Sequence, residues 1–296
     1  MDSLVAERGT RGRQALALAA AGCASASAVL LFGVHARPLG HAVLALAVAL
    51  GFAVGRVLGK DLLLIGLGLA IISTTSVEAD LDWGPFLRIG AVLLLAVVVP
   101  FAVDRWVYRR RAIRFPWRTG ERWPTVDKWY MVAVPVIGWL VLPWYFIRSG
   151  AYVNWPSIDD AAETARFFVG VNAVGTWDEL FFICVCFALL LRHFPVWQAN
   201  LLQATIFASF LWELGYREWG PLLTFPFALI QGAIFARTRS LTLVLIVHLL
   251  FDAIVFMAIM HAHDPGRFAV FPTQSSWTVL ESIDLVRTPL AVRFAR

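Results

Sequence analysis

The sequence predicts an all-α fold, that of a polytopic helical membrane protein with about nine transmembrane helices. Of its 296 residues, 59% are apolar and only 15% are charged, whereas a soluble domain carries about 25% charged residues. The mean hydropathy is +0.72 for a chain of 32.9 kDa. Polar side chains are too few to cover a soluble globule of this size, and the composition also excludes a disordered chain, a coiled coil and a disulfide-bonded secreted scaffold.

The transmembrane helices are predicted from the length of the apolar stretches. A helix needs roughly 20 residues to cross about 30 Å of hydrocarbon. Nine stretches approach or exceed this length: 15–34, 39–56, 61–77, 85–103, 129–148, 165–191, 198–214, 220–236 and 240–260. The second and third are separated only by a very short predicted turn at 56–60.

The basic residues predict the orientation. If the N-terminus is cytoplasmic, sixteen of the 25 Lys and Arg residues lie in inside segments, eight of them between Arg105 and Lys128. Because cytoplasmic loops are enriched in Lys and Arg, we predict a multi-pass protein of the plasma (inner) membrane with its N-terminus inside and its C-terminus outside. The basic stretch RRRAIR at 109–114 then favours contact with anionic lipid headgroups, so we expect the lipid bilayer, and no nucleic acid, as a partner.

Four ionisable residues in the second half are predicted to lie near mid-membrane, and we call them the quartet. Asp178 and Glu179 lie near the centre of 165–191, and His248 and Asp252 lie four residues apart on one face of 240–260. A carboxylate at the bilayer centre costs about 2.5–3.5 kcal/mol on insertion scales. Four such groups at one depth favour a functional cluster over one that only fixes helix packing.

The residue types of the quartet suggest its chemistry. Two adjacent carboxylates in a low dielectric repel each other, so we expect one to keep its proton and the pair to offer an acid and a base. Asp252 is expected to accept the ring proton of His248. With no H-E-x-x-H pattern and only one histidine at this depth, we expect neither a metal nor a cofactor.

Glu213, near the end of 198–214, allows two interpretations. It lies four residues before Arg217, so an interfacial ion pair would give it a purely structural role. It is otherwise a fifth candidate for the site, because an ionisable residue within a span is a functional candidate by default.

The chain resembles a known family over about residues 165–260. DELFFI at 178–183, HLLFD at 248–252 and the stretch GAIFARTRSLTLVLIVHLLFD before Ala253 resemble the CAAX prenyl protease and bacteriocin-processing (CPBP, or Abi) family of intramembrane proteases. The core helices of that family carry E-E-x-x-x-R, then F-x-x-x-H, then H-x-x-x-N or H-x-x-x-D.

Three positions depart from the family pattern. Asp178 replaces the first glutamate, Ile183 stands at the arginine position, and Leu211, four residues after Phe207, stands where the middle histidine would be. Glu213 is the only polar residue nearby that could substitute for that histidine. The departures leave open whether a protein of this fold still performs the reaction.

The resemblance implies a CPBP-like core at 129–264, preceded by N-terminal transmembrane helices and a basic loop at 1–128 and followed by a tail at 265–296. It also implies an intramembrane endopeptidase acting on a hydrophobic or membrane-anchored peptide or protein. Asp178 or Glu179 would activate a water, and His248 with Asp252 would stabilise the oxyanion. The alternatives are a catalytically degenerate membrane scaffold and a proton-coupled transporter, although the sequence shows no internal repeat of the transporter kind.

Overall fold

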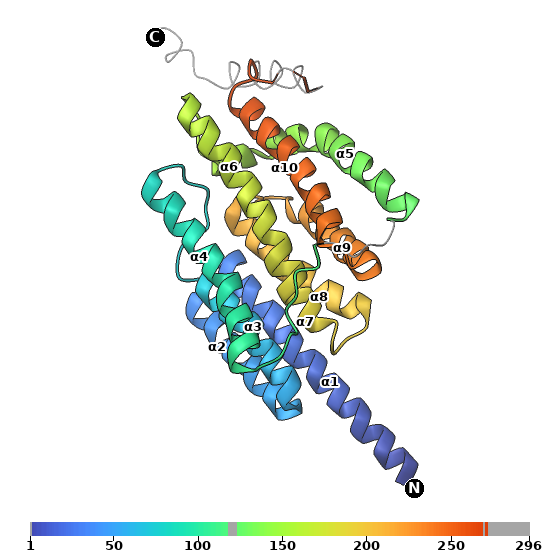
Figure 1. Ribbon diagram of the computed structural model, residues 1–296. Coiled ribbons are helices and arrows are strands. Elements are labelled where there is room, and N and C mark those ends of the chain that lie inside the picture. The colour runs from blue at the N-terminus through green and yellow to red at the C-terminus, as the bar shows by residue number, and fades with distance from the viewer. Residues whose placement is uncertain (1, 118–122, 269, 272–296) are drawn as a thin grey trace, which may run out of the picture.

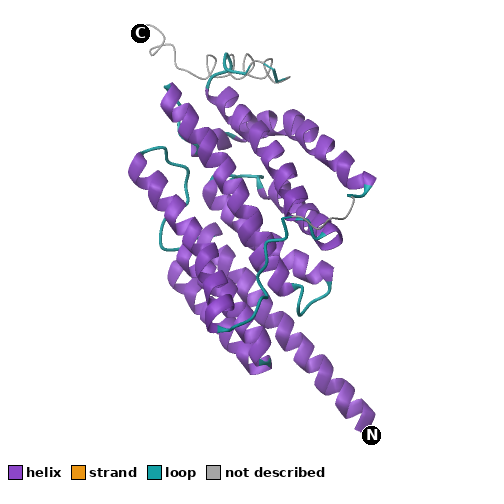
Figure 2. Ribbon diagram, viewed as in Figure 1, coloured by secondary structure: helices purple, strands orange, loops and turns teal. Residues whose placement is uncertain are grey.

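The computed structural model describes residues 2–117, 123–268 and 270–271, and within these residues every regular element is a helix (Figure 2). The predicted all-α fold is therefore confirmed. The first half contains α1 (Asp2–Ala28), the π-helical η1 (Val29–Gly33), α2 (Arg37–Val54), α3 (Arg56–Ile72), α4 (Trp83–Ala102) and the π-helical η2 (Val103–Val107).

The second half contains one long central helix and the helices around it. It consists of α5 (Thr125–Ser149), the 3-10 turn η3 (Ala151–Asn154), α6 (Ala161–Asp178), the π-helical η4 (Glu179–Phe187), α7 (Ala188–Leu190), α8 (Val196–Leu214), α9 (Pro221–Thr238) and α10 (Leu241–His263). The elements α6, η4 and α7 follow one another without interruption and correspond to the predicted span 165–191.

Each of the nine predicted spans falls on a helix, but six helical segments are long and apolar enough to cross a membrane within the described residues: Gly12–Gly33, Arg37–Val54, Trp83–Val107, Thr125–Ser149, Ala161–Leu190 and Leu241–His263. This makes the chain a multi-pass integral membrane protein. The helices α3, α8 and α9 are too short or not apolar enough to be counted with these six. The count of nine transmembrane helices therefore stays a prediction.

One boundary was predicted wrongly. Residues 56–60 are not a turn but the start of α3, and the break between α2 and α3 is confined to the neighbourhood of Gly55, which has an extended backbone. A single non-helical residue is enough to reverse the direction of the chain here. The predicted tail, 265–296, and the predicted outside C-terminus lie almost wholly outside the described residues.

The helices form two groups that meet along the central helix. In Figure 1, α2 to α4 lie together at the lower left, with α1 running from beside them toward the lower right; α5, α9 and α10 lie at the upper right, and α6 runs between the two groups. The helix α8 contacts α1 on one side and α9 on the other, while η4 contacts α3, α4 and α8. The central helix therefore joins both groups.

The apolar residues divide between this shared core and the lipid-facing surface. Phe181, Phe182 and Phe187 of η4 and Phe210 of α8 are completely buried, and Trp177 stacks on Phe181 with ring centroids 5.1 Å apart. Large apolar side chains are exposed on the outer helices, among them Leu39, Leu46, Leu87, Leu94, Val132 and Ile137. In a soluble protein such patches would be a liability, but on spanning helices they are the surface that the bilayer covers.

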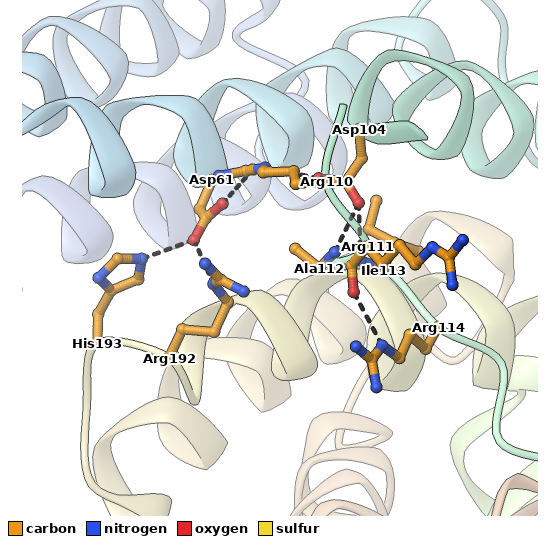
Figure 3. Close-up of polar contacts among 9 residues, drawn as sticks. All are labelled: Asp61, Asp104, Arg110, Arg111, Ala112, Ile113, Arg114, Arg192 and His193. Atoms are coloured by element: carbon orange, nitrogen blue, oxygen red, sulfur yellow. Dashed lines mark hydrogen bonds and ion pairs between the residues drawn. The ribbon is translucent and has the colours of Figure 1, made fainter. Parts of the chain in front are cut away.

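A buried ion network joins the first group to the end of the central helix, at the end of the molecule that carries the basic loop (Figure 3). Asp61 of α3 accepts hydrogen bonds from His193 Nε2 at 2.7 Å, from Arg192 Nε at 3.0 Å and from Arg110. The same Arg110 donates through Nε to Asp104 at 2.6 Å. Both carboxylates are buried, and each is satisfied by several donors, which is the condition under which buried charges are tolerated.

The basic loop, which lies between η2 and α5, continues from this network to α10, the helix that carries His248. Asp104 Oδ2 accepts hydrogen bonds from the backbone N–H groups of Ala112 and Ile113, at 2.7 and 3.1 Å. Further along, the carbonyl of Pro116 accepts a hydrogen bond from Leu241 N at 3.0 Å. The loop therefore links the ends of α3 and η2 to the start of α10.

Candidate active site

The structure brings the whole quartet together in the interior. Asp178 is the last residue of α6, Glu179 is the first residue of η4, and His248 and Asp252 are one turn apart in α10. All four side chains are buried. The junction between α-helical and π-helical geometry falls between the two carboxylates, and π-helical segments occur frequently at functional sites.

His248 lies at the centre of the quartet. Its Nδ1 is 2.7 Å from Glu179 Oε1, a hydrogen bond, while its Nε2 is 3.7 Å from Asp178 Oδ2 and 3.8 Å from Asp252 Oδ1. The last two distances exceed those of direct hydrogen bonds. Glu179 is therefore the residue that fixes the ring, and the expectation from the sequence that Asp252 does so is wrong. A spacing of i,i+4 brings two side chains to one face of a helix but does not determine which atoms meet.

A fifth polar residue, Gln231 of α9, belongs to the same cluster. Its Nε2 donates to Glu179 Oε1 at 2.8 Å and to the carbonyl of Val244 at 3.0 Å. The sequence analysis missed it because only ionisable residues were considered. An amide within the otherwise apolar stretch ALIQGAIF is the signal that would have identified it.

The close approach of α6 and α10 at the quartet depends on Gly175. A Cβ atom at this position would overlap the Asp252 carboxylate and lie 3.1 Å from His248 Cδ2. The absence of a side chain lets the backbone of α6 pass directly beside Asp252 and His248. The glycine lies one turn before Asp178, so it sets the position of that carboxylate as well.

A cavity of about 380 Å³ adjoins the quartet. Asp178, His248 and Asp252 line it, whereas Glu179 does not, so the two adjacent carboxylates have different surroundings. Asp178 Oδ1 and Asp252 Oδ2 have no hydrogen-bond partner in the protein. Most of the remaining wall is apolar or aromatic, including Phe86, Leu93, Phe167, Trp177, Phe227 and Phe251.

Glu213 lies apart from the quartet. It is buried at the end of α8 and does not line the cavity, and its Oε1 lies 3.9 Å from Nε2 of His35. The suggested pair with Arg217 is wrong, because Arg217 instead binds Glu78 of the loop between α3 and α4 at 2.5 Å. The chain reverses after Leu214, which directs Arg217 toward that loop.

The residues of the middle motif lie beside the quartet. The Phe207 ring is 6.3 Å from the His248 ring, and Phe227 of α9 packs edge-on against His248 at 5.1 Å. Leu211 lines the cavity. An apolar side chain therefore stands in the wall at the position where the resemblance would put a histidine.

A buried histidine surrounded by carboxylates, next to an apolar cavity in a helical membrane fold, is the kind of site expected of an intramembrane protease. Residues 160–254 match the family model described as type II CAAX prenyl endopeptidase Rce1-like. The match covers about a third of the chain and contains the whole quartet. The resemblance to the CPBP family is thereby confirmed, and this segment belongs to a CAAX-protease-type family.

Neither a curated protein nor a solved structure matches the chain. Within the described part of the chain, no group of three or more His, Cys, Asp or Glu residues is arranged to hold a metal ion.

The packing at Gly175 gives a test of the site geometry. We expect Gly175→Ala to destabilise the protein by about 1–3 kcal/mol, because overpacking forces α6 away from α10, and therefore to lower the Tm by several degrees in detergent. The matched control is Gly90→Ala in α4, where an added Cβ would meet no atom within 4 Å. Equal Tm values for the two variants would contradict the close packing of α6 against α10.

Proposed function

We propose that the protein is an intramembrane endopeptidase that hydrolyses a peptide bond of a hydrophobic or membrane-anchored substrate with a carboxylate-activated water. The observation that carries this proposal is the environment of His248. One ring nitrogen is held by Glu179 at 2.7 Å, and the other lies between Asp178 and Asp252 at 3.7 and 3.8 Å, at the cavity wall.

Asp178 is the proposed general base. Its distance from His248 Nε2 suits two groups that share a bound water, and it lines the cavity, as Glu179 does not. Asp178 takes one proton from water while the water oxygen attacks the carbonyl carbon of the scissile bond. When the C–N bond breaks, the same proton passes to the leaving nitrogen, while the second water proton stays on the new carboxyl group, which yields a carboxylic acid and an amine.

His248 is the proposed oxyanion donor, and Glu179 and Gln231 are its supports. With both ring nitrogens protonated, Nδ1 donates to Glu179 and Nε2 presents its N–H to the negative oxygen that forms on the substrate. Gln231 donates to the same oxygen of Glu179, at 2.8 Å. Asp252, on the cavity side, holds the cationic ring by charge attraction.

The Asp178 carboxylate is tested by reconstituting the protein and measuring cleavage of a fluorogenic peptide of ten apolar residues. We expect Asp178→Asn to lower turnover about 10²–10⁴-fold, the usual loss when a general base is removed, without changing the Tm. The matched control is Asp82→Asn, an exposed carboxylate at the start of α4, which should retain wild-type turnover. Cleavage that survives Asp178→Asn would exclude this mechanism.

A second candidate function, a degenerate scaffold, is favoured by Leu211, because an apolar residue there leaves the cavity wall without the family's middle histidine. The two candidates differ in their response to Leu211→His. If the protein is a peptidase, we expect the wild type to cleave the peptide faster than Asp178→Asn does. We also expect Leu211→His to raise the cleavage rate about tenfold or more above the wild type, because one donor in such a site contributes about 10²–10³ in rate.

The control for this variant is Leu211→Gln, which is polar but cannot supply an imidazole. Wild-type protein that cleaves no faster than Asp178→Asn, together with undiminished binding of the same peptide by both proteins, would establish the scaffold and exclude the peptidase.

We further propose that the protein lies in the plasma membrane with the N-terminus in the cytoplasm, and that the cavity opens to the outside. Support comes from the basic inside segments and from the cavity wall, which includes Asp80 and Leu81 of the loop between α3 and α4. With the N-terminus inside, the third predicted span ends outside, so this loop is expected to lie outside.

This orientation predicts the accessibility of single cysteines introduced at exposed positions. A membrane-impermeant maleimide should label Asp82→Cys in intact cells, whereas Arg111→Cys should react only after permeabilisation. The opposite pattern would invert the topology and put the cavity opening on the cytoplasmic side.

A further inference from the structure

The cavity has a second polar wall that the quartet does not account for. Tyr216, Trp155 and Thr224 line the same cavity as Asp178 and His248. Each of the three side chains is at most 6% exposed. They come from three separate segments: Trp155 from the loop after η3, Tyr216 from the turn between α8 and α9, and Thr224 from the first turn of α9.

The end of α8 brings Tyr216 into this wall. The helix ends at Leu214, Gly215 has a φ of 138°, and the Tyr216 N–H donates to the carbonyl of Leu211 at 2.9 Å. Glycine is suited to this positive φ. Tyr216 is thus joined by a hydrogen bond to Leu211, the position at which the middle histidine is replaced.

The ring of Tyr216 is held firmly by its aromatic neighbours. It lies parallel to Tyr145 with ring centroids 6.4 Å apart, and its edge meets Trp155 at 5.6 Å. Phe146 packs on it at 5.9 Å. Such packing fixes the orientation of the phenol before a ligand arrives, which reduces the entropic cost of binding.

The polar atoms of this wall are neutral hydrogen-bond donors. Burial raises the pKa of Tyr216 well above its ordinary value, with a further contribution from Asp252 and Asp178, so the phenol keeps its proton. Trp155 Nε1 and Thr224 Oγ1 are buried and have no hydrogen-bond partner in the protein. Leaving buried donors unpaired is unfavourable, so a ligand that pairs them gains affinity.

The charges around the cavity select the kind of acceptor. Neither lysine nor arginine lines the cavity in the described part of the chain, whereas Asp80, Asp178 and Asp252 do. The cation in the wall, His248, lies between Asp178 and Asp252 and is bound by Glu179. An anionic carboxylate would meet these acidic groups without a cation beside Tyr216, Trp155 or Thr224. A neutral carbonyl oxygen is the acceptor that three neutral donors fit best.

We propose that Tyr216, Trp155 and Thr224 form a carbonyl-binding subsite in which the Tyr216 O–H donates to a main-chain carbonyl of an internal peptide segment of the substrate. This inference rests on the proposed function, because it assumes that the cavity receives a peptide. It assigns to Tyr216 a hydrogen-bond donor role in the part of the cavity where Leu211 supplies none.

The test measures peptide binding in the Asp178→Asn background, where the peptide is not cleaved. The probe is a fluorescein-labelled decapeptide of apolar residues with a C-terminal amide, titrated in detergent micelles. We expect Tyr216→Phe, which keeps the ring, to raise the Kd about three- to tenfold, as the loss of one neutral hydrogen bond does. The control Tyr108→Phe removes a phenol outside the cavity and should leave the Kd unchanged.

The outcomes separate this inference from the proposed function. Failure of the peptide to bind the Asp178→Asn protein would overturn both. Equal Kd values with and without Tyr216→Phe would overturn only the carbonyl-binding subsite. Tighter binding of the same peptide with a free C-terminal acid than with the amide would overturn the selection for a neutral carbonyl.

Discussion

The hydrogen bond between His248 and Glu179 is the contact on which the arrangement of the second half depends. Ionisable side chains are costly in an apolar interior unless they are paired, and this one bond pairs the first residue of η4 with one in the middle of α10. Gln231 adds α9 to the same oxygen. Three helices are therefore fixed by one carboxylate, and Gly175 supplies the space that their approach requires.

The same contact separates the roles of two neighbouring carboxylates. Asp178 and Glu179 are adjacent in sequence, yet Asp178 lines the cavity and Glu179 points to His248 and Gln231. The change from α-helical to π-helical geometry occurs between them. Two side chains of similar chemistry thus acquire different environments, one that supports a neighbour and one that faces a ligand, as in other enzymes that use carboxylates in distinct roles.

The site is linked to the rest of the molecule on two sides. The basic loop is bound to the Asp61 and Asp104 network and contacts the start of α10 through the carbonyl of Pro116. At the other end of the site, the aromatic packing around Tyr216 connects α5, η3 and the turn after α8. The cavity is therefore enclosed by elements that are anchored outside it, which favours a preformed binding site.

Hydropathy alone determined the helical membrane fold and where its helices lie, because the length of an apolar stretch is a local property. Residue spacing also predicted that Asp178, Glu179, His248 and Asp252 share one depth. The tertiary structure decided which of these atoms meet: Glu179 instead of Asp252 on His248 Nδ1, Gln231 beside them, Arg217 on Glu78, and Glu213 apart from the cavity. These contacts depend on how each helix is rotated and how closely it approaches its neighbours, and those quantities arise from packing between segments far apart in the chain.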